Sequence, residues 1–195
     1  KAQNQEPGIL DMTLTQAQNP DQLFPDNVFE LEFENEPWRI AHTKSRREKA
    51  LASFLYSKGI AYFLPLFKKR QKSPKRIRYS YVPVFTGYIF FKADNSQRHE
   101  ALTSNQIAKI IEISDQRHFI NQLCQIQQAL SIDAPLYPFD FIEKGQEVEI
   151  KQGPLKGLRG IIQRKEKNYR LVLNVSDIFQ ALAVNIDADW VEPVR

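Results

Sequence analysis

The stretch Val82-Pro83-Val84-Phe85-Thr86-Gly87-Tyr88-Ile89-Phe90-Phe91 is the most aromatic decapeptide of the chain. Nearly all of its residues favour a pleated, buried strand. A run that is apolar on both faces belongs in the middle of a sheet covered by helices. Its aromatic side chains are more than one small core easily encloses. We therefore expect part of the stretch to remain open as a partner-binding groove.

Composition and length favour a globular protein of one medium domain or two small ones. The chain has 195 residues, of which 42% are hydrophobic. The single cysteine, Cys124, excludes an intramolecular disulfide and fits a reducing compartment. No apolar segment approaches a membrane span, and the first residues lack a signal-peptide core. We therefore expect a cytoplasmic protein with no membrane partner.

The charges are strongly segregated along the chain. Residues 1–37 carry eight acidic residues and only Lys1 as a base, whereas residues 38–78 carry thirteen Lys or Arg and only Glu48 as an acid. A concentrated positive face attracts polyanions over a Debye length of roughly 8 Å at physiological salt. The sequence therefore predicts a nucleic-acid partner.

Residues 1–36 are polar and acidic, which is typical of an N-terminal extension. A solvated tail is one interpretation. The other is that Val28–Phe33, in which apolar residues alternate with glutamates, adds a strand to the following domain.

Residues 37–134 predict an α+β domain, an antiparallel sheet covered by helices. Trp38–Thr43 is the first expected strand, and Ser45 with Glu48 has the form of a capping box before a helix that ends at Gly59. The next expected elements are a strand over Ile60–Phe67 that is broken at Pro65 and a basic loop or hairpin tip over Lys68–Arg78. Helices over Asp94–Ser104 and Phe119–Leu130 and a strand over Ile107–Ile113 complete the expected domain.

A proline-rich linker over residues 135–139 precedes a part of the chain with a different pattern of apolar residues. Residues 140–195 show no helical period, and glycines punctuate their short apolar segments. The expected strands are Glu147–Ile150, Gly160–Ile162, Arg170–Val175 and Ala181–Ile186. This pattern predicts a small, closed, five-stranded β-barrel.

Together these segments resemble the NusG family of transcription elongation factors, including specialised paralogues of the RfaH and UpxY kind. The run Gly145–Gly160 looks like a KOW motif, and Asp189–Val194 looks like the closing strand of a KOW domain. Trp38–Thr43 and Phe85–Phe90 look like the NusG N-terminal domain. The resemblance covers residues 37–195.

The resemblance implies that the first domain binds the clamp helices of RNA polymerase and suppresses pausing. The polymerase-binding groove would be built from His42, Phe85, Tyr88, Phe90 and Ile113. Phe90 could equally be a core residue. Tyr88 is the best candidate, since tyrosine can bury its ring and present a hydroxyl at an interface.

In the family, the start of the first helix and the hairpin lie near the non-template DNA strand. Lysine and arginine at these places would contact phosphates without reading sequence. Tyr79 and Tyr81 could stack on bases or serve only as strand residues. The predicted nucleic-acid-binding residues are Lys44, Arg46, Arg47, Lys49, Lys68, Lys69, Arg70, Lys72, Lys75, Arg76 and Arg78.

The resemblance also implies that the KOW domain recruits a small-subunit ribosomal protein or the termination factor Rho. The matching partner-binding residues are Leu155, Leu158, Ile178 and Phe179. Three departures from the family pattern suggest a specialised paralogue. They are Phe179-Gln180-Ala181 in place of Phe-Gly-Arg, Gln106 in place of a glycine, and the polar run Gln97-Arg98-His99-Glu100.

The sequence offers no case for an enzyme, a cofactor or a metal. Its three histidines, His42, His99 and His118, lie in separate segments without metal-ligand spacing. We expect a monomeric, nucleoid-associated transcription factor. Two alternatives remain: an RNA- or ribosome-binding KOW protein that does not act on polymerase, and a nonspecific nucleic-acid chaperone. Whether the two domains dock is left open.

Overall fold

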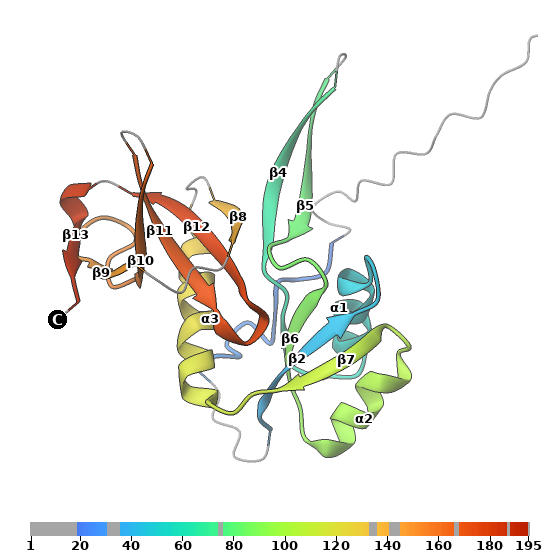
Figure 1. Cartoon of the computed structure of the whole chain (residues 1–195). Helices are drawn as coiled ribbons and strands as arrows, with labels where there is room; N and C mark the ends of the chain where they lie inside the picture. The colour runs from blue at the N-terminus through green and yellow to red at the C-terminus, as the bar shows by residue number, and fades with distance from the viewer. Residues whose placement is uncertain are drawn as a thin grey trace, which may run out of the picture.

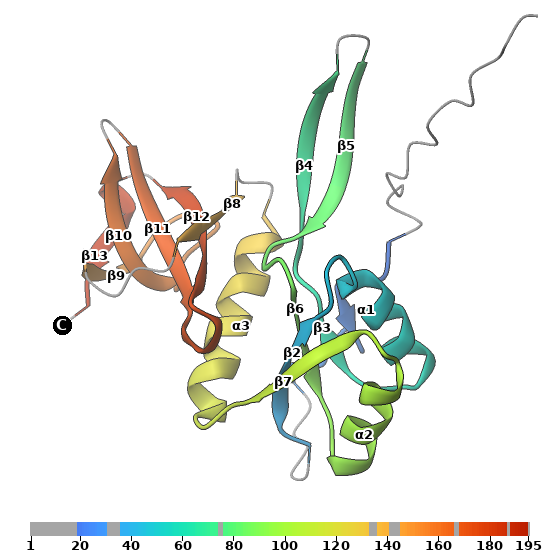
Figure 2. The same cartoon turned by 45° about the vertical axis from the view of Figure 1, so that its right-hand side comes forward.

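A computed structural model of the chain describes residues 19–30, 36–73, 76–132, 136–140, 145–165, 168–186 and 188–194. It shows an α+β domain, a long two-stranded hairpin that projects from this domain, and a C-terminal β-sheet (Figures 1 and 2). Helix α3 (Gln116–Leu130) lies between the first domain and the C-terminal sheet.

The first domain is built on a five-stranded antiparallel sheet with the order β1-β3-β6-β2-β7. These strands are β1 (Leu23–Phe24), β2 (Trp38–Thr43), β3 (Tyr62–Phe63), β6 (Tyr88–Lys92) and β7 (Ile107–Glu112). Alternation along the strands sends side chains to opposite faces. Ile40 and Phe90 pack with α3 residues such as Phe119, whereas Ala41 and Phe91 pack in the core formed with the other two helices.

Helix α1 (Glu48–Ser57) ends as the sequence predicts but begins differently. Gly59 follows the helix with φ +65, a conformation that L side chains rarely adopt. At the other end, the predicted capping box is absent: Arg47 is the N-cap, without a side-chain bond. The Glu48 carboxylate accepts instead from the backbone N–H of Gly87, at 2.7 Å. Glu48 therefore accepts a hydrogen bond from a distant segment of the chain and not from the start of its own helix.

Helix α2 (Asn95–Thr103) carries a capping box that links Asp94 and Gln97. The Gln97 N–H donates to Asp94 Oδ1 at 2.7 Å, and Gln97 Oε1 accepts from the Asp94 N–H at 3.0 Å. The predicted helix boundaries are close to those observed for α2 and α3.

The central strand is shorter than its composition suggests. β6 starts at Tyr88, and residues 84–87 form a bend and turn. The Val84 N–H donates to Pro65 O at 2.8 Å, and Thr43 N–H donates to Gly87 O at 2.8 Å. The first bond ties Val84 to the bend before the hairpin, and the second holds Gly87 next to β2; Gly87, with φ +86, completes the turn into β6.

The segment Asn19–Glu30 belongs to the first domain and is not a solvated tail. Its strand β1 pairs with β3, Val28 is buried, and the Phe29 ring stacks on Trp38 with centroids 5.3 Å apart. Residues 28–30 form a turn, so the strand expected over Val28–Phe33 does not form at its described start. Residues 31–33 and the first eighteen residues lie outside the described part.

The basic run, expected as a loop or hairpin tip, forms a hairpin that is a separate two-stranded sheet. It consists of β4 (Leu66–Ser73) and β5 (Arg76–Pro83), paired antiparallel along their whole length. As predicted, the apolar run that begins at Ile60 is interrupted at Pro65, which separates β3 from β4.

The C-terminal part is a six-stranded antiparallel sheet with the order β13-β9-β10-β11-β12-β8. Its strands are β8 (Leu136–Asp140), β9 (Gln146–Ile150), β10 (Arg159–Lys165), β11 (Asn168–Val175), β12 (Gln180–Ile186) and β13 (Val191–Pro193). Short 3-10 turns occupy Ser176–Ile178 and Ala188–Trp190.

The expected closed, five-stranded barrel is not confirmed, because the strand pairing stops at β13 and β8 and does not close. The extra strand comes from the predicted linker. Residues 136–140 pair with β12, for example Phe139 opposite Ala181, so these residues extend the sheet. None of the helices in the described ranges is both long and apolar enough to cross a membrane.

The C-terminal sheet packs against α3. One hydrophobic cluster continues from Phe90 of the first sheet through Leu123 and Ile126 of α3 to Leu155 and Val175 of the C-terminal domain. α3 therefore contributes to the cores of both parts.

Candidate nucleic-acid and partner interface

The hairpin places cationic and aromatic side chains side by side. Lys68 and Lys69 are exposed on β4, and the Tyr79 side chain on β5 is 52% exposed. Lys68 Nζ lies 4.5 Å from the centroid of the Tyr79 ring, which is a cation–π contact. A surface of this kind can pair a phosphate with the lysine while a base approaches the ring.

The other predicted basic residues of the hairpin follow the same two strands. The register places Arg70 opposite Tyr79, and Lys72 opposite Ile77. The side chains of residues 70–78 lie outside the described part, as does Lys75 altogether. The prediction for Arg70, Lys72, Lys75, Arg76 and Arg78 therefore stays a prediction.

The start of α1 supplies a second group of cations. Lys44, Arg46 and Arg47 are exposed, and Lys44 Nζ donates to Asn105 Oδ1. Lys49 behaves differently, because its ammonium donates to Tyr81 O at 2.6 Å. Burial lowers the pKa of Lys49, against the opposing effect of Glu48. Lys49 thus holds the base of the hairpin, and its bond competes with any phosphate contact.

The predicted groove residues separate into a pair that reaches the surface and a buried group. His42 is exposed and Tyr88 is half-buried, and their rings stack with centroids 5.0 Å apart. Phe85 and Phe90 are buried and pack edge to face, with Phe90 in turn against Phe119 of α3. Ile113 is buried as well.

Helix α3 accounts for the buried group, because its residues Phe119 and Leu123 lie in one hydrophobic cluster with Phe90. Tyr88 packs against this cluster but stays half-buried, and His42 is exposed. A partner can contact the His42–Tyr88 pair as the molecule stands. Phe85 and Phe90 support that pair from the core and are not part of an open groove in this arrangement.

Two consecutive residues of α1 join the hairpin to the His42–Tyr88 pair. Glu48 holds the N–H of Gly87, whose hypothetical Cβ would lie 3.6 Å from the His42 ring. Lys49, the next residue, holds Tyr81 in the hairpin. The first turn of α1 therefore fixes the position of both surfaces relative to each other.

Three of the four predicted partner-binding residues of the C-terminal domain are buried. They are Leu155, Leu158 and Ile178, and only Phe179 is exposed, at 70%. Phe179 occupies the left-handed region with φ 51, which is uncommon for a bulky residue. In this arrangement Phe179 is the member of the set that a partner could reach.

Glutamines of α3, which sequence reasoning missed, hold the C-terminal sheet. Gln125 Oε1 accepts from the Arg159 N–H at 2.7 Å, and Gln128 Nε2 donates to Lys156 O at 3.1 Å. Gln122 Nε2 donates to Ser176 Oγ at 3.0 Å. The spacing of these glutamines, three residues apart along one helix, was the available signal. A cleft of about 560 Å³ lies beside them.

No group of three or more His, Cys, Asp or Glu side chains that could hold a metal ion occurs among the described residues.

The fold of the first part is therefore an antiparallel sheet with helices on both faces and an inserted basic hairpin. Residues 36–130 match the model of the NusG family, described as transcription termination factor nusG. The chain thus carries a NusG-family domain over residues 36–130, which indicates a transcription factor. Members of this family are non-enzymatic and generally bind RNA polymerase. A search of the curated proteins found no match.

Proposed function

We propose that this chain is a transcription elongation or antitermination factor that binds the clamp helices of RNA polymerase and the adjacent DNA. The observation that carries the proposal is the link made by the first turn of α1. It connects the stacked His42–Tyr88 pair, which reaches the surface, to a projecting cationic hairpin within a NusG-family domain. The protein would favour the active clamp conformation, which is a population shift and not a reaction.

The polymerase surface is the sheet end formed by His42 and Tyr88, where a stacked aromatic pair can contact apolar side chains of a partner helix. Phe85, Phe90 and Ile113 keep this surface in place from beneath. The nucleic-acid surface consists of the exposed cations at the start of α1 and along the hairpin. Their contacts supply affinity and salt dependence.

The C-terminal domain is proposed to act as a KOW domain that recruits a further partner. Support comes from the agreement of the strands with the KOW-like sequence and from exposed Phe179 at the turn before β12. A small-subunit ribosomal protein and Rho are the two candidates that the family suggests.

Polymerase retention tests the first surface. Tyr88→Ala should weaken retention by about ten-fold or more, the range of a central aromatic anchor. Leu102→Ala is the matched control, because Leu102 is an exposed apolar residue on α2, away from the proposed site. Equal retention by wild type and Tyr88→Ala would contradict the assignment. Ribosomal RNA retained by both, without polymerase, would support the RNA-binding alternative.

Salt dependence tests the second surface. The double variant Lys68→Ser with Lys69→Ser should reduce the slope of log affinity against log salt by about 2 for a DNA oligonucleotide. An unchanged slope would show that these lysines do not contact phosphate. Loss of all activity in this variant, with no effect of Tyr88→Ala, would instead favour the chaperone alternative.

A further inference from the structure

The segment Asn19–Glu30 precedes the NusG-family match, which starts at residue 36, yet it is bound to the base of the hairpin. We infer that this segment is an N-terminal clasp that fixes the direction of the hairpin, with Gln22 as its positioning residue. The inference rests on the proposed function, because it assigns the clasp a role in presenting the hairpin to nucleic acid.

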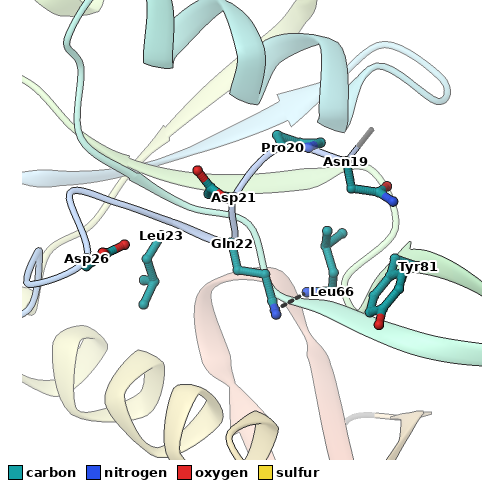
Figure 3. A pocket seen from close by; sticks show the side chains of 8 residues that line it. All are labelled: Asn19, Pro20, Asp21, Gln22, Leu23, Asp26, Leu66 and Tyr81. Atoms are coloured by element: carbon teal, nitrogen blue, oxygen red, sulfur yellow. Dashed lines mark hydrogen bonds between the residues drawn. The ribbon is translucent and has the colours of Figure 1, made fainter. Parts of the chain in front are cut away.

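Gln22 holds the chain at the point where β3 passes into the hairpin. Its backbone carbonyl accepts from the Leu64 N–H at 2.7 Å, and its side-chain Oε1 accepts from the Leu66 N–H at 2.8 Å. Figure 3 shows the second of these bonds, with Gln22 extended toward Leu66. The residue between them, Pro65, has no N–H. One glutamine thus binds the backbone donors on both sides of the bend.

The rest of the clasp is anchored well enough to act as a fixed support. Leu23 and Phe24 pair with β3, and the Tyr62 hydroxyl donates to Asp21 O at 3.1 Å. The Phe24 ring packs edge to face on Tyr56 of α1, with centroids 4.8 Å apart. Phe29 packs on the other side of the sheet edge, against Trp38 and Phe63.

The two strands of the hairpin are held from two sides. The clasp holds β4 through Leu66, and α1 holds β5 through the bond from Lys49 to Tyr81 O. Between these two attachments lies a pocket of about 290 Å³, lined by clasp residues and by Leu66 and Tyr81 (Figure 3). This open space leaves room for the base of the hairpin to shift if one attachment is lost. Losing the Gln22 side chain should therefore release β4 first.

The direct test is the distance between the hairpin and the body of the domain. Spin labels are placed at Lys69→Cys on β4 and Ser53→Cys on α1, both exposed positions, in full-length protein with Cys124→Ser. Gln22→Ala should broaden the distance distribution measured by electron–electron double resonance. Gln22→Glu keeps an oxygen acceptor for the Leu66 N–H and should restore the narrow distribution.

Gln97→Ala is the matched control, because it also removes a glutamine Oε1 that accepts a backbone N–H, but at α2. It should leave the distance distribution at the wild-type width. A Gln22→Ala distribution as narrow as that of wild type would overturn the clasp role. So would equal broadening in Gln97→Ala, which would show a general loss of rigidity.

The functional half of the inference is tested by affinity for a single-stranded DNA oligonucleotide. Without labels, Gln22→Ala should bind about three- to ten-fold more weakly than wild type, with no such loss in Gln97→Ala. Broadened distances with unchanged affinity would overturn this half. A failure of the proposed function gives a different result, in which neutralising Lys68 and Lys69 leaves the affinity for the oligonucleotide unchanged. The distance distributions would still test whether the clasp fixes the hairpin.

Discussion

At the scale of single residues, the site depends on side chains that serve as acceptors for distant backbone N–H groups. Glu48 is an example, since it is buried and its carboxylate accepts from Gly87. Glu48→Ala should destabilise the first domain by about 1–3 kcal/mol, because the Gly87 N–H loses its partner. Urea unfolding measures this cost. Glu48→Gln keeps an acceptor and should recover most of the lost stability; an equal loss in both variants would contradict the role of the bond.

Tyr62 gives the clasp a defined dependence on pH. Burial, with smaller effects of Asp21 and Tyr56, raises the pKa of Tyr62 from 10.0 to about 12. Because the folded state favours the neutral phenol, this contribution to stability is complete below the unfolded pKa and is lost as pH rises through about 12. Tyr62→Phe removes the bond to Asp21 O and should cost about 1 kcal/mol at neutral pH. The difference from wild type should shrink in alkali, as followed by urea unfolding; a constant difference would refute the titration.

At the scale of elements, the sequence predicted α1, α2 and α3 and strands such as β2, β7, β11 and β12, but not β1 or β8. The end of α1 at Gly59 followed from the glycine itself, and the basic run was expected as a loop or hairpin tip. Prediction failed where hydrogen bonds between distant segments decide the backbone. Val84 and Phe85 are as apolar as strand residues, yet the Val84 N–H bonds to Pro65 O and the two residues lie outside β6. Gln22 escaped prediction because a single polar side chain carries no apolar period. The three-residue spacing of the α3 glutamines places them on one helix face but does not identify their partners.

The same distinction between local and distant constraints separates two glycines. Gly59→Ala should destabilise the protein by about 1–2 kcal/mol, because only the left-handed backbone is strained and no atom lies within 4 Å of the added Cβ. Gly160→Ala should cost clearly more, since its Cβ would lie 2.4 Å from Val172 O in the neighbouring strand. Thermal unfolding compares the two. A larger loss of stability for Gly59→Ala than for Gly160→Ala would show that β10 and β11 can move apart at little energetic cost.

At the scale of the whole molecule, the contact between α3 and the C-terminal sheet combines an apolar core with side-chain hydrogen bonds. The sequence did not identify it, because the glutamines lie 28 to 54 residues away from their partners Lys156, Arg159 and Ser176. This contact also explains why Leu155 and Ile178 are buried despite their position in surface turns.

Removing two of these bonds should loosen the contact without unfolding either part. Gln122→Ala with Gln125→Ala takes away about 1–3 kcal/mol of polar contact, while the apolar cluster remains. The two parts should then tumble more independently, which ¹⁵N relaxation detects as shorter rotational correlation times. Asn121→Ala, in the wall of the same cleft, is the matched control and should tumble as wild type does. Unchanged correlation times in the double variant would mean that the apolar cluster alone maintains the docked arrangement.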